Sequence, residues 1–156
     1  MAEEYTSNQH DHEMSTSTKD ILGQISVGCH MAIDSTEQIM EHVTNDRFKE
    51  LIGKYRDDHE KLKAEVEQRL RNHGIEIPTS GVMAKAFSWM SAETKLMFND
   101  TDREAAKLLM DGCNMGIQSI SEYINDNPDA CETCKQYAKR LVSLEEDFMQ
   151  ELKPYL

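Results

Sequence analysis

Proline, strand-like alternation and long apolar runs are all scarce in this chain. Only three of its 156 residues are proline, and few prolines permit long helices because proline breaks a helix interior. No segment alternates apolar and polar residues with the period of two that a half-buried strand requires. No run approaches the roughly 18 apolar residues that would span a membrane. These absences predict an all-α protein with no membrane-spanning segment.

Basic residues are also few. The chain has 17 Lys and Arg against 29 Asp and Glu, which gives a formal net charge of −12. This charge repels phosphate backbones and anionic lipid, so we expect no nucleic-acid or membrane partner. Residues 1–17 form a polar, acidic stretch that lacks the basic and apolar regions of a secretion signal. We therefore expect a mobile tail over 1–17 and a cytoplasmic protein.

Motifs for nucleophilic, phosphate-binding and dinucleotide chemistry are missing. The chain contains no GxSxG, GxxxxGK[ST] or GxGxxG. A basic recognition helix for DNA is missing too. The sequence therefore favours a protein that is not an enzyme.

Apolar residues recur instead at the helical spacing of three and four. The stripe is clearest in the second segment, at Phe48, Ile52, Tyr55, His59, Leu62, Val66 and Leu70. The same spacing predicts four amphipathic helices. Their expected ranges are from Thr16 or Thr18 to about Val43, about 46–73, about 102–125, and from Pro128 to just before Pro154. The expected bundle occupies residues 18–153.

The connections between these helices differ in length. Asn45–Asp46 and the 125–128 turn are short, so they predict two antiparallel hairpins. A shorter apolar segment, Val82–Phe98, lies between the hairpins and is nearly as long as the bundle. Two hairpins joined by one long crossover form the ferritin-like arrangement. We therefore predict a ferritin-like four-helix bundle with an additional crossover helix at about 82–98.

Several residues and short motifs of this chain match the pattern of a known protein family. They are Phe48, Leu51 and Tyr55 after the first turn, His73–Gly74 with Pro78, Trp89 and Met90 in the crossover, and Gly112 and Gly116 in the third helix. Over about Thr18–Leu152 the chain resembles the uncharacterised bacterial ferritin-like four-helix-bundle proteins. The resemblance implies this fold and a buried metal site.

The chain departs from an active di-iron bundle, which uses Glu-x-x-His pairs on two helices. The residues that lie three positions before the six histidines of the chain are Ser7, Gln9, Val27, Ile39, Arg56 and Leu70. None of them is acidic. The di-iron motif is therefore incomplete.

His59 lies on the apolar stripe of the second helix. One interpretation is a hydrogen-bonded core residue. The other is a ligand in a mixed site with Glu145, Cys113 and Asp34, which would suit iron or zinc. For Asp34, a solvated helix face is the alternative, and family likeness alone suggests an inward position.

Cys131 and Cys134 form a CxxC at the start of the fourth helix, where the helix dipole can lower the pKa of Cys131. No strand precedes the motif, so a thioredoxin-like site is not indicated. We expect reduced thiols here, with reversible disulfide formation as the alternative.

The sequence thus favours a non-catalytic binding or structural protein that self-associates, most simply as a dimer, or binds another protein. The excess apolar surface of Val82–Phe98 motivates this expectation. The alternative is an iron- or zinc-binding redox or storage protein with a non-standard site in the core.

Overall fold

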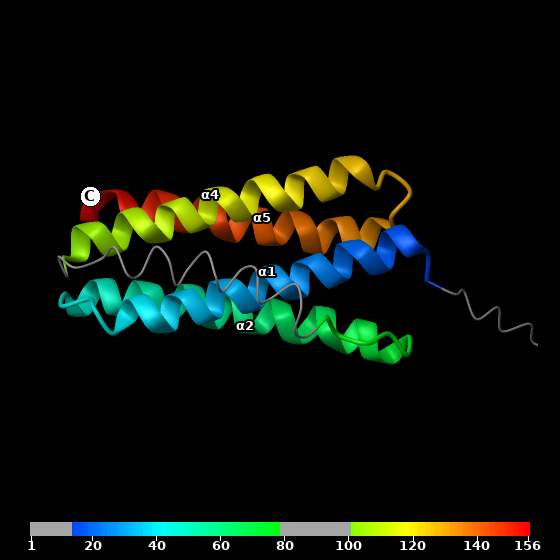
Figure 1. Ribbon diagram of the computed structural model, residues 1–156, viewed down its shortest axis with the longest axis horizontal. Helices are drawn as coiled ribbons and strands as arrows, with labels where there is room; N and C mark the ends of the chain where they lie inside the picture. The colour runs from blue at the N-terminus through cyan, green and yellow to red at the C-terminus, as the bar shows by residue number, and fades with distance from the viewer. Residues whose placement is uncertain (1–13, 79–100) are drawn as a thin grey trace, which may run out of the picture.

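The computed structural model describes residues 14–78 and 101–156, and within them it is all-α. The helices are α1 (Thr16–Met40), α2 (Asp46–Asn72), α4 (Asp102–Asp126) and α5 (Glu132–Leu152), followed by a 3-10 turn, η1 (Lys153–Tyr155). Figure 1 shows α1 paired with α2 and α4 paired with α5, which together form an elongated four-helix bundle. No strand occurs in these two ranges, as the sequence predicts.

The first hairpin begins and ends at side chains suited to helix termini. Ser15 accepts a hydrogen bond from the Thr18 amide, and Asn45 accepts one from the Phe48 amide. At the end of α2, Gly74 adopts a φ of 67°. The Gly74 amide donates to the Arg71 carbonyl and the Ile75 amide donates to the Leu70 carbonyl, which is a Schellman ending.

The second hairpin contains one correction to the sequence analysis. Pro128 was expected at the first position of the fourth helix, but α5 begins at Glu132 and Cys131 is its N-cap. The expectation was wrong because the sulfur of Cys131 accepts a hydrogen bond from the Cys134 amide and caps the helix itself. Pro128 lies in the preceding turn, where its carbonyl accepts from Lys135.

Contacts at both ends of the bundle fix the relative directions of the hairpins. The Asp102 carboxylate at the start of α4 accepts from the backbone amides of Thr44 and Asn45, at 2.7 and 3.0 Å. After α2, the Pro78 ring lies 3.3 Å from a Cβ built on Gly23, near the opposite end of α1. The chain therefore leaves α2 at one end of the bundle and enters α4 at the other, so α2 and α4 run in the same direction (Figure 1).

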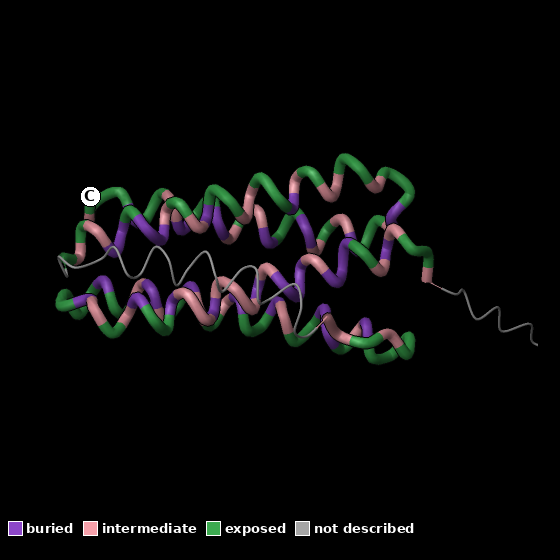
Figure 2. The backbone as a smooth tube through the Cα atoms, viewed as in Figure 1, coloured by how far each residue is buried: buried purple, intermediate pink, exposed green. Residues whose placement is uncertain are grey.

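The core is apolar at both ends of the bundle. One cluster contains Leu22, Leu62 and Leu141, and the other contains Phe48, Ile52 and Phe148. His59 and Glu145 are buried but belong to neither cluster. The buried positions form inward stripes along each helix (Figure 2).

The predicted inward faces are largely those observed. The helical spacing of the sequence predicts six inward positions on the fourth helix, and all six are buried: Cys134, Ala138, Leu141, Glu145, Phe148 and Leu152. The same spacing predicts an inward position for Ala32 on the first helix, but Ala32 is only partly buried, because it lies beside a cavity described below. Helix α1 begins at Thr16, which is one of the two expected starts.

Two predictions lie wholly or partly outside the described residues. These are the crossover at 82–98 and most of the tail at 1–17. Among the helices that the structure describes, none combines the length and apolar character needed to cross a membrane.

Candidate functional site

Four buried side chains form a hydrogen-bonded chain at mid-bundle, which we call the Glu145 relay. Its members are Cys113 on α4, Tyr55 and His59 on α2, and Glu145 on α5. The Cys113 thiol donates to the Tyr55 hydroxyl at 3.8 Å, and this hydroxyl donates to Glu145 Oε2 at 2.5 Å. Glu145 Oε1 lies 3.1 Å from His59 Nε2.

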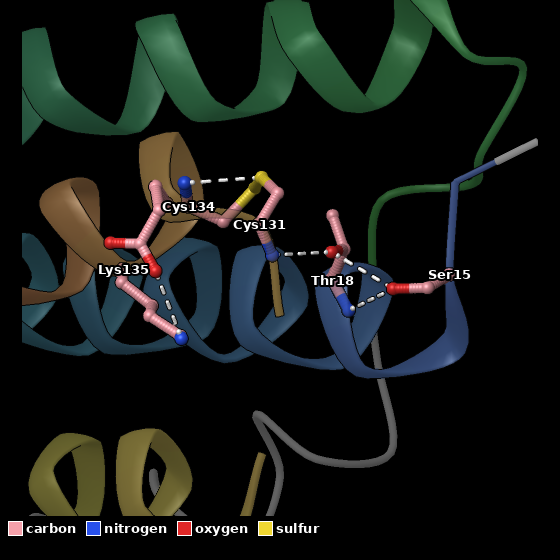
Figure 3. Close-up of a disulfide and its surroundings, with 6 residues drawn as sticks. Ser15, Thr18, Cys131, Cys134 and Lys135 are labelled. Atoms are coloured by element: carbon pink, nitrogen blue, oxygen red, sulfur yellow. Dashed lines mark hydrogen bonds and ion pairs between the residues drawn. A yellow bond between two sulfur atoms is a disulfide. The ribbon is translucent and has the colours of Figure 1, made fainter. Parts of the chain in front are cut away.

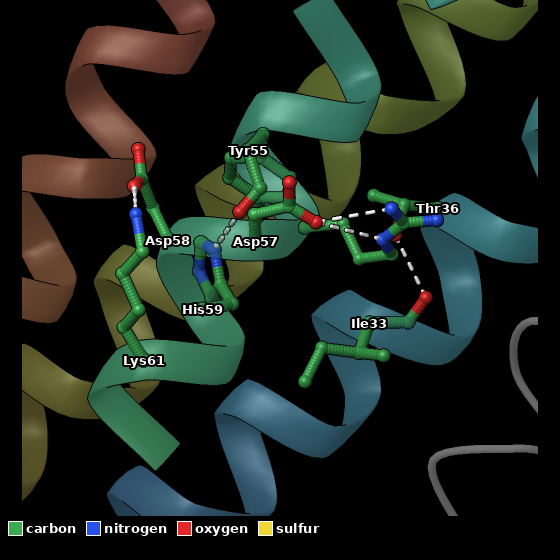
Figure 4. Close-up of polar contacts among 8 residues, drawn as sticks. Ile33, Thr36, Tyr55, Asp57, Asp58, His59 and Lys61 are labelled. Carbon is green, nitrogen blue, oxygen red and sulfur yellow. Dashed lines mark hydrogen bonds and ion pairs between the residues drawn. The ribbon is translucent and has the colours of Figure 1, made fainter. Parts of the chain in front are cut away.

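The contact at the other ring nitrogen of His59 determines how many protons His59 and Glu145 hold together. His59 Nδ1 lies 2.9 Å from the Tyr55 carbonyl oxygen (Figure 4), and a carbonyl can only accept, so Nδ1 carries a hydrogen. The contact between Nε2 and Glu145 Oε1 then contains one proton. Whether that proton lies on the imidazole or on the carboxyl group, His59 and Glu145 together are electrically neutral.

Aromatic packing holds the relay in place. The Tyr55 ring stacks on Phe148 with a centroid separation of 3.9 Å and lies 4.1 Å from the His59 ring. The side chain of His59 is fully buried, and that of Glu145 is 6% exposed. The acids beside His59 pair with cations outside the relay: Asp57 lies 3.0 Å from Arg56, and Asp58 lies 3.3 Å from Lys61.

Burial controls the ionisation of the neighbouring groups. It raises the pKa of Tyr55 well above its usual value, and the nearby Glu145 carboxylate raises it further. The same two causes, in the same order, raise the pKa of Cys113 and of Cys29. Both cysteines therefore remain thiols at neutral pH, and a thiol is a weaker nucleophile than a thiolate.

A cavity of about 190 Å³ lies beside the relay, between α1 and α4. We call it the α1/α4 cavity. Tyr55, Cys113 and Glu145 contribute to its wall, together with apolar side chains such as Ile39, Leu108 and Leu109. The cavity thus joins a mostly apolar lining to one end of a polar network.

A second polar cluster was not anticipated from the sequence. Glu67 on α2 is 9% exposed, and its Oε1 accepts from the Ser26 hydroxyl and lies 2.9 Å from His30 Nε2. Arg71 lies 3.8 Å from Glu67 Oε2. The sequence contains a signal for it, because Ser26–His30 and Glu67–Arg71 are both i, i+4 pairs. Whether these two pairs face each other depends on how α1 packs against α2.

The residues proposed as metal ligands are only partly brought together. His59 and Glu145 are in direct contact, and Cys113 joins them through Tyr55. Asp34 is half-exposed and does not line the α1/α4 cavity. Across residues 14–78 and 101–156, no three or more His, Cys, Asp or Glu side chains are grouped as a metal ion would require.

The CxxC is oxidised in the structure. Cys131 and Cys134 form a disulfide with a Cα–Cα separation of 5.3 Å, while Cys29 and Cys113 are free and buried. One helical turn brings the two residues within bonding distance, and the structure shows the disulfide that the sequence analysis gives as the alternative to reduced thiols. The Cys131 amide also donates to the Thr18 hydroxyl, which ties the start of α5 to α1 (Figure 3).

Comparison with known proteins adds no assignment: no protein-family model, no curated protein and no solved structure matches this chain.

Proposed function

We propose that this chain is a ferritin-like four-helix-bundle protein that lacks a complete di-iron motif and acts as a non-catalytic binding or structural protein. The Glu145 relay carries this proposal. A di-iron bundle needs several inward carboxylates at mid-bundle. In the described residues, the two buried carboxylates are Glu145 and Glu67, and each already bonds to a histidine.

The direction of the helices supports the ferritin-like part of the proposal. Because α2 and α4 run the same way, the chain between Pro78 and Thr101 must connect opposite ends of the bundle. We propose that Val82–Phe98 makes this connection as a helix. Slow amide hydrogen exchange across 82–98 would support this, and exchange at the rate of an unstructured peptide would oppose it.

Self-association is the second part of the proposal. The large hydrophobic side chains that are exposed in the described residues are only Met115 and Leu156. The apolar Val82–Phe98 segment is therefore the better source of an interface between two copies, or with another protein. It contains Trp89, the only tryptophan in the chain, which is a convenient reporter.

Sedimentation velocity across micromolar concentrations tests self-association directly. A dimer should dissociate on dilution, and Trp89 emission should shift to longer wavelength as the ring enters water. The single substitution Trp89→Ala should weaken the dimer, and Leu156→Ala serves as a control outside the segment. A strict monomer at every concentration would exclude the self-association proposal.

The rival function is an iron- or zinc-binding redox or storage protein. The contact between His59 and Glu145, with Cys113 nearby, favours this alternative. The protein should be purified from cells grown with added iron, and its metal content measured by mass spectrometry. Near-stoichiometric iron or zinc that is lost in His59→Ala would replace our proposal with the rival, and a sub-stoichiometric content unaffected by the substitution would support ours.

A further inference from the structure

The α1/α4 cavity is large enough for a small molecule. Its volume is about 190 Å³, and apolar protein cavities of about 150 Å³ bind benzene. Most of its wall is apolar, and a few polar groups meet at one side, which is the usual composition of a small-molecule site.

Small residues on the two facing helices create this space. Gly28 and Ala32 lie one turn apart on α1, and Gly112 and Gly116 lie one turn apart on α4. A Cβ built on Gly112 meets nothing within 4 Å, so this wall is open. A Cβ built on Gly116 would lie 3.4 Å from Glu145 Oε1. The absence of a side chain at Gly116 therefore leaves that oxygen uncovered on the α4 side.

The buried polar groups of the wall can accept hydrogen bonds but have no hydrogen left to give, and the other polar residues of the described lining, Gln24, Ser35 and Ser119, are more exposed. Four buried lining residues carry polar hydrogens or oxygens: Thr36, Tyr55, Cys113 and Glu145. Thr36 donates to the Ile33 carbonyl, Tyr55 donates to Glu145, and Cys113 donates to Tyr55. Glu145 Oε1 lies against His59 Nε2, and an oxygen with two lone pairs can accept a second hydrogen bond. A ligand that bonds to Glu145 Oε1 must therefore supply the donor.

The charge of the cavity lining further restricts the charge that the ligand can carry. Among the described residues that line the cavity, only Glu145 is an acidic or basic residue, and His59 compensates its charge. A cation entering this apolar space would be a buried charge without a counter-ion, and an anion would face the carboxylate. Only an uncharged donor avoids both costs.

We propose that the α1/α4 cavity binds one small, uncharged aromatic alcohol of the size of phenol, whose ring fills the apolar space and whose hydroxyl donates to Glu145 Oε1. This site goes beyond self-association and does not depend on it.

Calorimetric titration of the full chain with three probes tests the ligand chemistry. Phenol should bind saturably at one site per chain. Toluene has nearly the same shape but no hydroxyl, so it should bind about tenfold more weakly, which is the loss of one hydrogen bond to a charged group. Benzylammonium should not bind measurably. No saturable binding of phenol, equal affinity for toluene, or tighter binding of benzylammonium would each overturn the proposal.

Two glycines provide a matched pair of variants that test the location. Gly112 and Gly53 are both inside helices, and a Cβ on either meets nothing within 4 Å, but only Gly112 lines the cavity. Gly112→Leu should weaken phenol binding at least tenfold, and Gly53→Leu should leave it unchanged. Both substitutions raise helix propensity. Unchanged binding in Gly112→Leu would place the phenol elsewhere and overturn the proposal.

Glu145→Gln tests the hydrogen bond without filling the cavity. The amide has nearly the same shape as the carboxylate but no charge, so phenol affinity should fall towards that of toluene while toluene affinity stays the same. An unchanged ratio of the two affinities would contradict the role of Glu145. This comparison uses the ratio within one variant, so it remains decisive if Gly112→Leu does not fold.

Discussion

At the scale of single residues, the Glu145 relay shows how a carboxyl group is accommodated in an apolar core. Burying an unpaired carboxylate costs many kcal/mol. Here Oε2 accepts from Tyr55 and Oε1 contacts His59, whose other nitrogen donates to a backbone carbonyl. Each side chain of the relay provides the hydrogen-bond partner that the next one needs, so the network is stable only while it is complete.

Removing the Tyr55 hydroxyl should therefore destabilise the fold. Tyr55→Phe leaves Glu145 Oε2 without its donor and Cys113 without its acceptor, while the stacked ring is kept. We expect a loss of about 1–3 kcal/mol in the free energy of unfolding, measured by urea denaturation. Tyr123→Phe, at a half-exposed position on α4, should change it by less than about 0.5 kcal/mol. Equal effects of the two substitutions would show that the relay contributes no stability.

The buried thiols predict instability at alkaline pH. Burial raises the pKa of Cys29 and Cys113 in the folded state, whereas in the unfolded chain each titrates near about 8.5. Above that pH the unfolded state releases protons that the folded state keeps. The stability present at neutral pH should therefore fall as pH rises, by up to about 1.4 kcal/mol per pH unit for each thiol.

Comparing urea denaturation of the wild type and Cys113→Ala at several pH values from about 8 to about 10 checks this slope. The variant should be less stable at neutral pH, because it loses packing, but its stability should fall less steeply with pH. Parallel curves for the two proteins would contradict the assignment of Cys113.

At the scale of secondary-structure elements, helix ends do much of the positioning. Asp102 at the start of α4 accepts from the turn between α1 and α2, and Thr18 near the start of α1 accepts from the start of α5. Each contact satisfies backbone amides that a turn or helix end leaves unpaired. The two hairpins are therefore fixed to each other at both ends of the bundle.

The Cys131–Cys134 disulfide should contribute little to stability. It closes a loop of one helical turn, and the chain-entropy gain from a disulfide grows with loop length. Reduction should lower the free energy of unfolding by about 2 kcal/mol at most and should release two thiols, mapped by peptide analysis to Cys131 and Cys134. A disulfide between Cys29 and Cys113, or a large drop in melting temperature on reduction, would show that Cys131 and Cys134 are not the reactive pair.

Substituting Cys131 separates the disulfide from the helix cap. Cys131→Ser removes the disulfide but keeps a side chain that caps α5 well, while Cys131→Ala removes both. The alanine variant should be about 1 kcal/mol less stable than the serine variant.

The helices could be predicted from the sequence because local patterns determine them. The stripe on α5 marks six positions that are all buried, and Asn45 and Gly74 occur at the observed helix ends. The pairing of Glu67 with Ser26 and His30, and the α1/α4 cavity, could not be predicted. They depend on the rotation and sliding of one helix against another, which periodicity does not specify. Pro128 was misplaced because a cysteine is an unusual N-cap.

At the scale of the whole molecule, the net charge of −12 opposes the association of two copies. A dimer held by apolar contact must overcome this repulsion. Salt should therefore strengthen the proposed dimer, because the Debye length falls from about 30 Å at 0.01 M to about 8 Å at 0.15 M. Sedimentation at the two ionic strengths measures the effect, and dissociation of the dimer on adding salt would indicate an interface held by ion pairs instead.

The central claim is that this bundle does not perform di-iron chemistry, and iron oxidation tests it most directly. Ferrous iron should be added to the protein without oxygen, and the formation of ferric species followed by absorbance after exposure to air. Glu145→Gln and protein-free buffer serve as controls. We predict the same oxidation rate in all three samples. A faster, stoichiometric oxidation by the wild-type protein that is lost in Glu145→Gln would contradict the account.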